Sequence, residues 1–285
     1  MKNFLKSVFF AVYPSAPEVI ITPGGARFGN LLYFFLRAHI YEQEGKVLKI
    51  LYTKHMDDIV TYFPSLKKFM ITEDEVTFYH KKDRSNQFYQ VFGTHFKDHH
   101  LDAFIKDHLL SSEKIKAYLN RIPKPHLTDL TINIRRGDFY QHGNVSIYGY
   151  DQVAFVKFVF ENHLSNKAWN KIKIVSDDME WCKREFLFLR DYTDTLHFPS
   201  FSDEKIIESF LEVVQSRNLI ITNSTFSFWA SYISNYKYGS AETTICPIFG
   251  ARGTEEIDIY QNNPKWQMIK DFNFNNVAFS THKTR

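Results

Sequence analysis

The chain has only two cysteines, and it lacks any apolar run long enough to cross a membrane. Its 285 residues include Cys182 and Cys246 alone, which are too few for a disulfide framework. A transmembrane helix needs about 20 predominantly apolar residues in a row, and no such run is present. The charge is also nearly balanced, with 35 basic and 32 acidic residues. Bulk electrostatics therefore exclude a nucleic-acid-binding protein, and any anion site must be local.

Familiar spacings of metal ligands are missing as well. The twelve histidines do not occur in a His-Glu-x-x-His pattern, and the two cysteines are not paired as in zinc sites. Asp177 and Asp178 are the obvious carboxylates for magnesium, but no further carboxylate or histidine stands beside them at ligand spacing. The sequence therefore predicts no metal and no cofactor. Cys182 lies in a helical pattern, where we expect a buried thiol.

The amino-terminal residues do not form a convincing secretion signal. Residues 8–12 are apolar and follow Lys2 and Lys6, but Tyr13 and Pro14 interrupt this short run. A cleavage site of small residues is lacking too. We therefore expect an N-terminal extension that packs on the protein or lies at an interface.

The composition allows substantial cores, with 44% hydrophobic and 17% aromatic residues. Short β-branched runs alternate with helical patterns, which predicts an α/β fold with parallel strands. Residues 54–100 show no clear hydrophobic period. Two prolines in residues 121–126 indicate a linker. The expected strands are residues 18–22, 47–52, 131–134, 171–176, 195–197 and 219–223, and the expected helices are 31–44, 111–119, 150–163, 179–188 and 203–215.

Two adjacent arginines stand at the end of one β-branched strand, in the segment Thr-Ile-Asn-Ile-Arg-Arg-Gly-Asp of residues 131–138. A guanidinium group is always charged, and its fork of donors matches phosphate oxygens two at a time. Ligands of open α/β sheets lie beyond the carboxyl ends of the strands. The segment therefore indicates a diphosphate site, with a solvated or salt-bridged turn as the alternative. Successive side chains of a strand point to opposite faces of the sheet, so Arg135 and Arg136 face opposite sides. We therefore expect Arg136 to pair with Asp138 or a helix end.

Three further segments place glycines or polar residues directly after a strand. Residues 24–30, Gly-Gly-Ala-Arg-Phe-Gly-Asn, form a glycine-rich turn. Ser176, Asp177 and Asp178 follow a second strand, and residues 223–229, Asn-Ser-Thr-Phe-Ser-Phe-Trp, follow a third. Their hydroxyl, amide and carboxylate groups suit ligand binding, and helix capping is the competing explanation.

In this order, the four segments resemble the family 11 α-1,2-fucosyltransferases, over about residues 18–235. The family's opening glycine motif is similar to residues 24–30, and its His-x-Arg-Arg-Gly-Asp signature aligns with residues 133–138. Its Ser-Asp-Asp followed by Glu-Trp-Cys matches residues 176–178 and 180–182, and its Asn-Ser-(Ser/Thr)-Phe-Ser-(Trp/Phe)-Trp matches residues 223–229.

The resemblance implies a GT-B-like α/β fold, with two Rossmann-type domains facing across a cleft. Residues 1–127 would form an acceptor-side domain and residues 128–285 a GDP-fucose-binding domain. The implied reaction is the inverting transfer of L-fucose from GDP-β-L-fucose to the 2-hydroxyl of a galactose in a bacterial surface glycan, such as O-antigen or lipopolysaccharide. Since the donor is made in the cytosol, the expected location is the cytoplasm, with peripheral contact at the inner membrane where the acceptor is lipid-linked.

The resemblance also implies roles for individual residues. Arg135 would stabilise the departing diphosphate, Asp138 is the candidate general base, and Asp177 with Asp178 would contact guanine. The implied acceptor-side loop consists of Gly24, Gly25, Gly29 and Asn30, together with His142. The implied donor-binding residues are Asn133, Arg135, Arg136, Ser176, Asp177, Asp178, Asn223, Ser224, Thr225 and Ser227.

The chain departs from the family pattern at two places. Asn133 stands where relatives have histidine, although an amide also donates and accepts hydrogen bonds. Ala26, Arg27 and Phe28 stand where relatives have a single leucine, so we expect a different loop shape and a different choice of acceptor. Two alternatives remain open: a GDP-fucose enzyme of another linkage, α-1,6 or protein O-linked, and a non-catalytic glycan- or anion-binding module.

Overall fold

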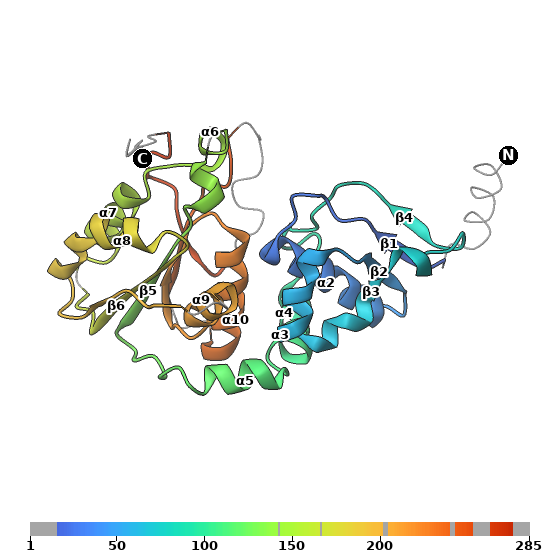
Figure 1. Cartoon of the computed structure of the whole chain (residues 1–285). Helices are drawn as coiled ribbons and strands as arrows, with labels where there is room; N and C mark the ends of the chain where they lie inside the picture. The colour runs from blue at the N-terminus through green and yellow to red at the C-terminus, as the bar shows by residue number, and fades with distance from the viewer. Residues whose placement is uncertain are drawn as a thin grey trace. The chain divides into compact units, whose positions relative to one another are not determined.

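A computed structural model gives the architecture of the chain (Figure 1). It divides into two units between Arg121 and Ile122, at the start of the proline segment that the sequence predicts as a linker. The predicted domain boundary, after residue 127, lies a few residues further along. The structure describes residues 16–141, 143–165, 167–201, 205–239, 243–252 and 263–275.

The first unit is built on a four-stranded sheet in the order β3-β2-β1-β4, with every described ladder parallel. Helix α2 (Phe28–Gln43) packs on this sheet, and residues 31–36 within it are all buried. A helix that is apolar all round is a buried helix, which explains its run of leucine and aromatic residues. The strands are β1 (Glu18–Ile20), β2 (Leu48–Leu51), β3 (Met70–Ile71) and β4 (Lys81–Asp83).

Short helical turns make up most of the rest of this unit, including the stretch where the sequence shows no period. Such turns are too short to display a hydrophobic repeat. One of them, η4, is a π-helical turn that continues directly from α4. The elements are η1 (Lys54–Met56), α3 (Asp57–Tyr62), η2 (Pro64–Phe69), η3 (Glu73–Glu75), α4 (Asp98–Phe104), η4 (Ile105–Leu109) and α5 (Glu113–Leu119).

The second unit is built on a six-stranded sheet in the order β10-β9-β8-β5-β6-β7, again with parallel ladders. Counted in chain order within the unit, this is the order 3-2-1-4-5-6 of the Rossmann fold. The direction of winding reverses between β5 and β8, which are hydrogen-bonded neighbours. The strands are β5 (Asp129–Ile134), β6 (Lys171–Ser176), β7 (Leu196–His197), β8 (Asn218–Ile220), β9 (Thr244–Pro247) and β10 (Gln267–Ile269).

Helices cover both faces of this sheet. Figure 1 shows α7 and α8 on one face and α9 and α10 on the other. Strands β5 and β6 are buried over nearly their whole length, as expected for strands of a doubly covered sheet. The elements are η5 (Gly137–Tyr140), α6 (Val145–Tyr148), α7 (Gln152–His163), α8 (Met179–Glu185), η6 (Leu187–Asp191), α9 (Lys205–Val214) and α10 (Thr225–Tyr238).

These two sheets confirm the predicted α/β class and the two Rossmann-type units. Three boundaries differ from prediction by three residues: α2 begins at Phe28 rather than at residue 31, α8 ends at Glu185 rather than at residue 188, and β8 ends at Ile220 rather than at residue 223. Gly29 is buried inside the first turn of α2, so the glycine-rich segment ends earlier than its composition indicates. Cys182 is buried and free, as predicted, and burial raises the pKa of its thiol to about 12. Among the described helices, none combines the length and the apolar character of a membrane span.

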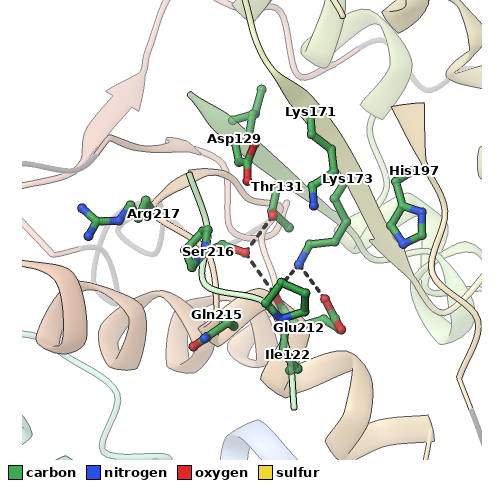
Figure 2. A pocket seen from close by; sticks show the side chains of 13 residues that line it. Ile122, Asp129, Thr131, Lys171, Lys173, His197, Glu212, Gln215, Ser216 and Arg217 are labelled. Carbon is green, nitrogen blue, oxygen red and sulfur yellow. Dashed lines mark hydrogen bonds and ion pairs between the residues drawn. The ribbon is translucent and has the colours of Figure 1, made fainter. Parts of the chain in front are cut away.

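A small cavity of about 140 Å³ lies at the amino-terminal edge of the second sheet (Figure 2). Lys173, in β6, reaches from this edge towards α9 and is buried. Its Nζ atom lies 2.6 Å from Glu212 Oε2 and donates to the Glu212 carbonyl oxygen at 3.0 Å. Burial lowers the pKa of Lys173, and the neighbouring Glu212 carboxylate opposes this effect. The pair is therefore a buried structural ion pair between sheet and helix.

Replacing Glu212 by alanine should destabilise the second unit. Lys173 would lose its buried counter-charge, and breaking a buried pair from one side costs about 3 to 5 kcal/mol. Urea denaturation followed by circular dichroism measures this loss. The folded variant favours neutral Lys173. Its loss in free energy of unfolding should therefore shrink as the pH rises towards the ordinary lysine pKa.

The matched control is Glu180→Ala. Glu180 pairs with Lys183 at the same 2.6 Å distance, but this pair is exposed. Solvent screens an exposed pair, so its loss should change stability little. Equal losses of unfolding free energy in Glu212→Ala and Glu180→Ala would show that burial does not strengthen the Lys173–Glu212 pair.

Candidate active site

Three of the four segments singled out in the sequence follow strands that lie side by side in the second unit. Strands β6, β5 and β8 are consecutive in the sheet, so the residues that follow them emerge at one carboxyl edge. Ile134 pairs with Ser176 in the parallel register, which brings Arg135 next to Asp177. This edge includes the reversal of winding between β5 and β8, where α/β sheets bind their ligands.

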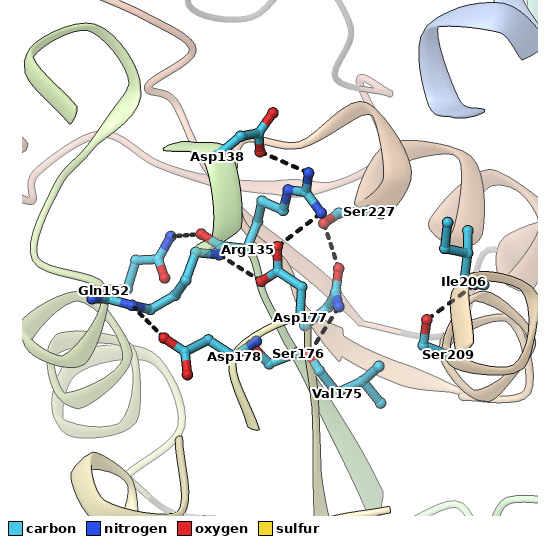
Figure 3. A network of polar contacts seen from close by, with 12 residues as sticks. Arg135, Asp138, Gln152, Val175, Ser176, Asp177, Asp178, Ile206, Ser209 and Ser227 are labelled. Carbon is cyan, nitrogen blue, oxygen red and sulfur yellow. Dashed lines mark hydrogen bonds and ion pairs between the residues drawn. The ribbon is translucent and has the colours of Figure 1, made fainter. Parts of the chain in front are cut away.

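Arg135 lies at the centre of the site, between two carboxylates (Figure 3). Its Nη1 atom is 2.8 Å from Asp177 Oδ2, and its Nη2 atom is 2.7 Å from Asp138 Oδ1. The side chain is 33% exposed, so the guanidinium group is both held and accessible. Gln152, at the start of α7, donates from Nε2 to the Arg135 carbonyl oxygen at 2.8 Å and fixes the backbone.

Asp177 joins the ends of β5 and β6. Its Oδ1 atom accepts a hydrogen bond from the Arg136 backbone nitrogen at 2.8 Å, while Oδ2 pairs with Arg135. Gly137 passes directly over this carboxylate, and a Cβ atom there would overlap Asp177 Oδ2. Both Asp177 oxygens are thus engaged within the turn of residues 135–137.

Arg136 has different partners from Arg135. Its guanidinium carbon lies 4.1 Å from the centre of the Tyr140 ring and 3.8 Å from the Trp181 ring. Its Nε atom is 3.6 Å from Asp178 Oδ2. A cation between two aromatic faces is held by both rings, so Arg136 is a structural residue in this arrangement.

The predicted alternative pairing of Arg136 with Asp138 is wrong. Asp138 pairs with Arg135 instead, because the helical turn η5 (Gly137–Tyr140) brings residue i+3 back towards residue i. The other predicted partner, a helix end, is confirmed: Asp178 is the N-cap residue of α8 and accepts from the Trp181 backbone nitrogen at 3.3 Å. Asp178 thus caps α8 through one of its two oxygens, Oδ1, and its own nitrogen donates to Ser176 Oγ at 3.0 Å.

Asn133 and Ser227 lie beneath the edge of the sheet rather than on it. Asn133 is 4% exposed and donates from Nδ2 to the Val175 carbonyl oxygen at 2.9 Å. Ser227 has no exposed surface, and its hydroxyl donates to Asn133 Oδ1. Since neither side chain faces solvent, they connect α10 to β5 and β6 and support the site from below.

Asn223, Ser224 and Thr225 link β8 to α10. The Asn223 amide donates to the carbonyl oxygens of Tyr148, at 3.1 Å, and Gly250, at 2.8 Å, so it anchors neighbouring loops. Ser224 occupies the N-cap position of α10, and its hydroxyl makes no capping hydrogen bond there. Ser224 thus does not cap the first turn of α10 with its side chain, and the backbone N–H groups of a helix start favour anions.

Reasoning from the sequence missed several residues around Arg135. Phe139 lies under its guanidinium carbon at 5.8 Å and stacks on Tyr148 with 4.9 Å between ring centres. Gln152 and Tyr140 also contact the arginine pair. Such residues belong to turns and helix starts without a regular period, so the only available signal was their nearness to residues 131–138.

The predicted acceptor-side loop belongs to the first unit. Gly24 and Gly25 form a turn with open space around them. Gly29 is buried in α2, and Asn30 Oδ1 accepts from Gln90 Nε2 at 2.8 Å. His142 lies outside the described residues.

The chain belongs to glycosyl transferase family 11, whose family model matches residues 39–248. This match includes all three polar strand ends of the second unit. Escherichia coli alpha-1,2-colitosyltransferase is 30% identical over 156 residues, which are 50% of this chain and 47% of that protein. The similarity therefore spans about half the length of this curated relative.

Among solved structures, the chain is distantly similar to POFUT1 in complex with GDP, with a TM-score of 0.46 and 9% identity. That similarity covers 81% of this chain and 99% of the other. Escherichia coli heptosyltransferase WaaC, with ADP-2-deoxy-2-fluoro heptose, gives a TM-score of 0.45 and 11% identity, over 89% of this chain and 93% of the other.

Glycosyltransferases of this family use a nucleotide-sugar donor, and replacing Gly137 by alanine should weaken binding of its nucleotide part by about tenfold to a hundredfold. The new Cβ would push Asp177 away from Arg135, and small misplacements of this kind have effects of that order. Isothermal titration calorimetry with nucleoside diphosphates as probes, GDP among them, measures the change, and circular dichroism checks the fold. Gly25→Ala, with open space around it, should bind the same probe like the unaltered protein. Undiminished affinity in Gly137→Ala would show that the Arg135–Asp177 contact does not prepare the site.

Proposed function

We propose that this chain is an inverting glycosyltransferase that moves L-fucose from GDP-β-L-fucose to the 2-hydroxyl of a galactose in a bacterial surface glycan. One observation carries the proposal. In a chain of family 11, an accessible arginine is held by two carboxylates at the reversal point of a Rossmann sheet. The proposed place of action is the cytoplasm, or the inner membrane face if the acceptor is lipid-linked.

The diphosphate of the donor would lie between Arg135 and the start of α10. At the same edge of the sheet, Arg135 offers a positive charge and the start of α10 offers backbone N–H groups. Of the two carboxylates on Arg135, Asp138 is 49% exposed and Asp177 is 26% exposed. An exposed ion pair is screened by solvent and is weak. Phosphate oxygens would therefore displace Asp138 and leave Asp177 in place.

In the transfer step, the acceptor hydroxyl attacks the anomeric carbon of fucose from the side opposite the diphosphate. The bond from that carbon to the β-phosphate oxygen breaks, and GDP departs with the electron pair. Arg135 would stabilise the negative charge that accumulates on the phosphate. Asp138, released from Arg135 by the donor, would accept the proton of the hydroxyl. The chemistry proposed here uses no metal.

Guanine recognition is proposed for Asp178 rather than for Asp177. Both Asp177 oxygens are engaged with the arginine segment, whereas the Asp178 side chain is 43% exposed. A carboxylate accepts from the N1 and N2 donors of guanine, so Asp178 is the better placed of the two.

A colitosyl donor is the second candidate, because the sequence is similar to an alpha-1,2-colitosyltransferase. Colitose is fucose without its 3-hydroxyl group, so one phosphate-binding site suits either nucleotide sugar. Comparing kcat/KM for GDP-fucose and GDP-colitose on one galactosyl acceptor decides between them. NMR analysis of the product separates the α-1,2 linkage from α-1,6 and protein O-linked products. Binding of GDP or glycan without any turnover would favour the non-catalytic module.

Replacing Arg135 by alanine should lower kcat by about a hundredfold to a thousandfold. Loss of one preorganised donor to the developing charge typically has this effect. GDP release from GDP-fucose with a galactosyl acceptor, without added metal, measures it. Arg135→Lys should recover only part of the rate, because an ammonium group lacks the planar fork.

The control is Arg190→Ala, which removes an exposed arginine of the same unit. It should turn over at the rate of the unaltered protein. Normal turnover in a folded Arg135→Ala variant would remove this guanidinium group from the mechanism.

Asp138→Asn separates two roles for that carboxylate. As a general base, Asp138 would accept the proton of the acceptor hydroxyl, and loss of such a base lowers kcat by about 10² to 10⁴. We expect kcat of the asparagine variant to fall by a factor in this range while GDP affinity changes little. A variant with weaker GDP binding but an unchanged kcat would show that Asp138 only positions Arg135.

A further inference from the structure

A pair of buried histidines lies in the first unit, within the part of the chain that the structure describes. His39, in α2, is 3% exposed, and His108, in the π-helical turn η4, is 4% exposed. His108 Nε2 lies 3.1 Å from His39 Nδ1, although the residues are 69 positions apart in the sequence. Two imidazole nitrogens thus point at each other in a protected interior.

Ser65 fixes the orientation and the tautomer of His108. Its hydroxyl donates to the His108 carbonyl oxygen at 3.4 Å, which leaves the Ser65 oxygen to accept from His108 Nδ1 at 3.0 Å. With the proton on Nδ1, the lone pair of Nε2 points towards His39. Metal-binding histidines show this same arrangement, in which the outer ring nitrogen donates to an oxygen.

His39 is not satisfied by its present partners. Its Nε2 atom is buried and has no hydrogen-bond partner among the described residues. Burial lowers the pKa of His39 and brings that of His108 to about 4.

A carboxylate and a lysine complete the surroundings. Glu42 lies one helical turn after His39, and one ligand atom each from His39, Glu42 and His108 all lie within 4.8 Å of one another. Lys68 Nζ contacts both Glu42 oxygens, at 2.7 and 2.8 Å. The ammonium group therefore occupies a cation position on the exposed side of the cluster.

We propose that His39, His108 and Glu42 bind a divalent transition-metal ion of the zinc type. Two imidazoles and one carboxylate form a common protein ligand set for zinc, with solvent as the fourth ligand. Zn–N bonds of about 2.0 to 2.1 Å separate two tetrahedral ligands by slightly more than 3 Å, close to the 3.1 Å between the two ring nitrogens. The ion would replace the proton shared by the two rings.

The backbone of η4 supports this inference. π-helical turns insert one residue into a helix and occur frequently at functional sites. Here the turn carries His108 and follows α4 without a break. An ion at this place would join α2 to η4 and η2, which supplies Ser65 and Lys68. The site belongs to the first unit and takes no part in the proposed transfer chemistry.

Zinc titration of the tag-free, full-length protein tests the site. After treatment with a chelator and dialysis, calorimetry with Zn²⁺ should show one high-affinity site, and Co²⁺ should give the visible absorption of a four-coordinate complex. His39→Ala and His108→Ala should each weaken binding by more than about a hundredfold. Ser65→Ala, which removes only the orienting hydroxyl, should weaken it by about tenfold.

Lys68→Gln removes the competing ammonium group and keeps all three ligands, so it should bind Zn²⁺ several-fold more tightly. His55→Ala and His99→Ala remove exposed histidines of the same unit and should bind like the unaltered protein. Should a histidine variant fail to fold, Glu42→Gln and Lys68→Gln must still shift the affinity in opposite directions. Absence of zinc binding up to millimolar concentration, or binding that survives both histidine substitutions, would overturn the proposal.

Discussion

The contact of Asp177 with the turn after β5 is the constraint on which the candidate site depends. One carboxylate receives the Arg136 backbone N–H group and the Arg135 side chain, and only a glycine at position 137 leaves room for it. The pairing of Ile134 with Ser176 sets this geometry. A slip of one residue in either strand would turn the side chains to the other face and separate the pair.

The two adjacent arginines differ in burial and therefore in role. Arg136 is only 13% exposed and lies between Tyr140 and Trp181, so it stiffens the link from β5 to α8. Arg135 keeps exposed surface and has one weakly held partner, Asp138. A cation that is positioned but not fully satisfied is suited to meet a charged ligand, because little must be broken when that ligand arrives.

The histidine pair shows the limit of reasoning from spacing. Metal patterns in sequences are recognised when ligands stand within a few residues of one another, as in one helical turn. His39 and Glu42 satisfy that spacing, but His108 approaches them only because α2 packs against the segment of α4 and η4. Two separate candidate sites with different chemistry are therefore built on the two units: a proposed anion site on strand ends, and a proposed cation site among helices.

The sequence by itself determined the strand-helix alternation, the polar strand ends and the family, since strand and helix periods and ordered motifs are local properties of the chain. It also left helix capping open as an alternative role for Asp177 or Asp178. Only the tertiary structure decided that Asp138 pairs with Arg135 and that Ser227 is buried under Asn133. The physical reason is that ion pairs and burial depend on strand register and helix packing, which join residues far apart in the chain and leave no local pattern.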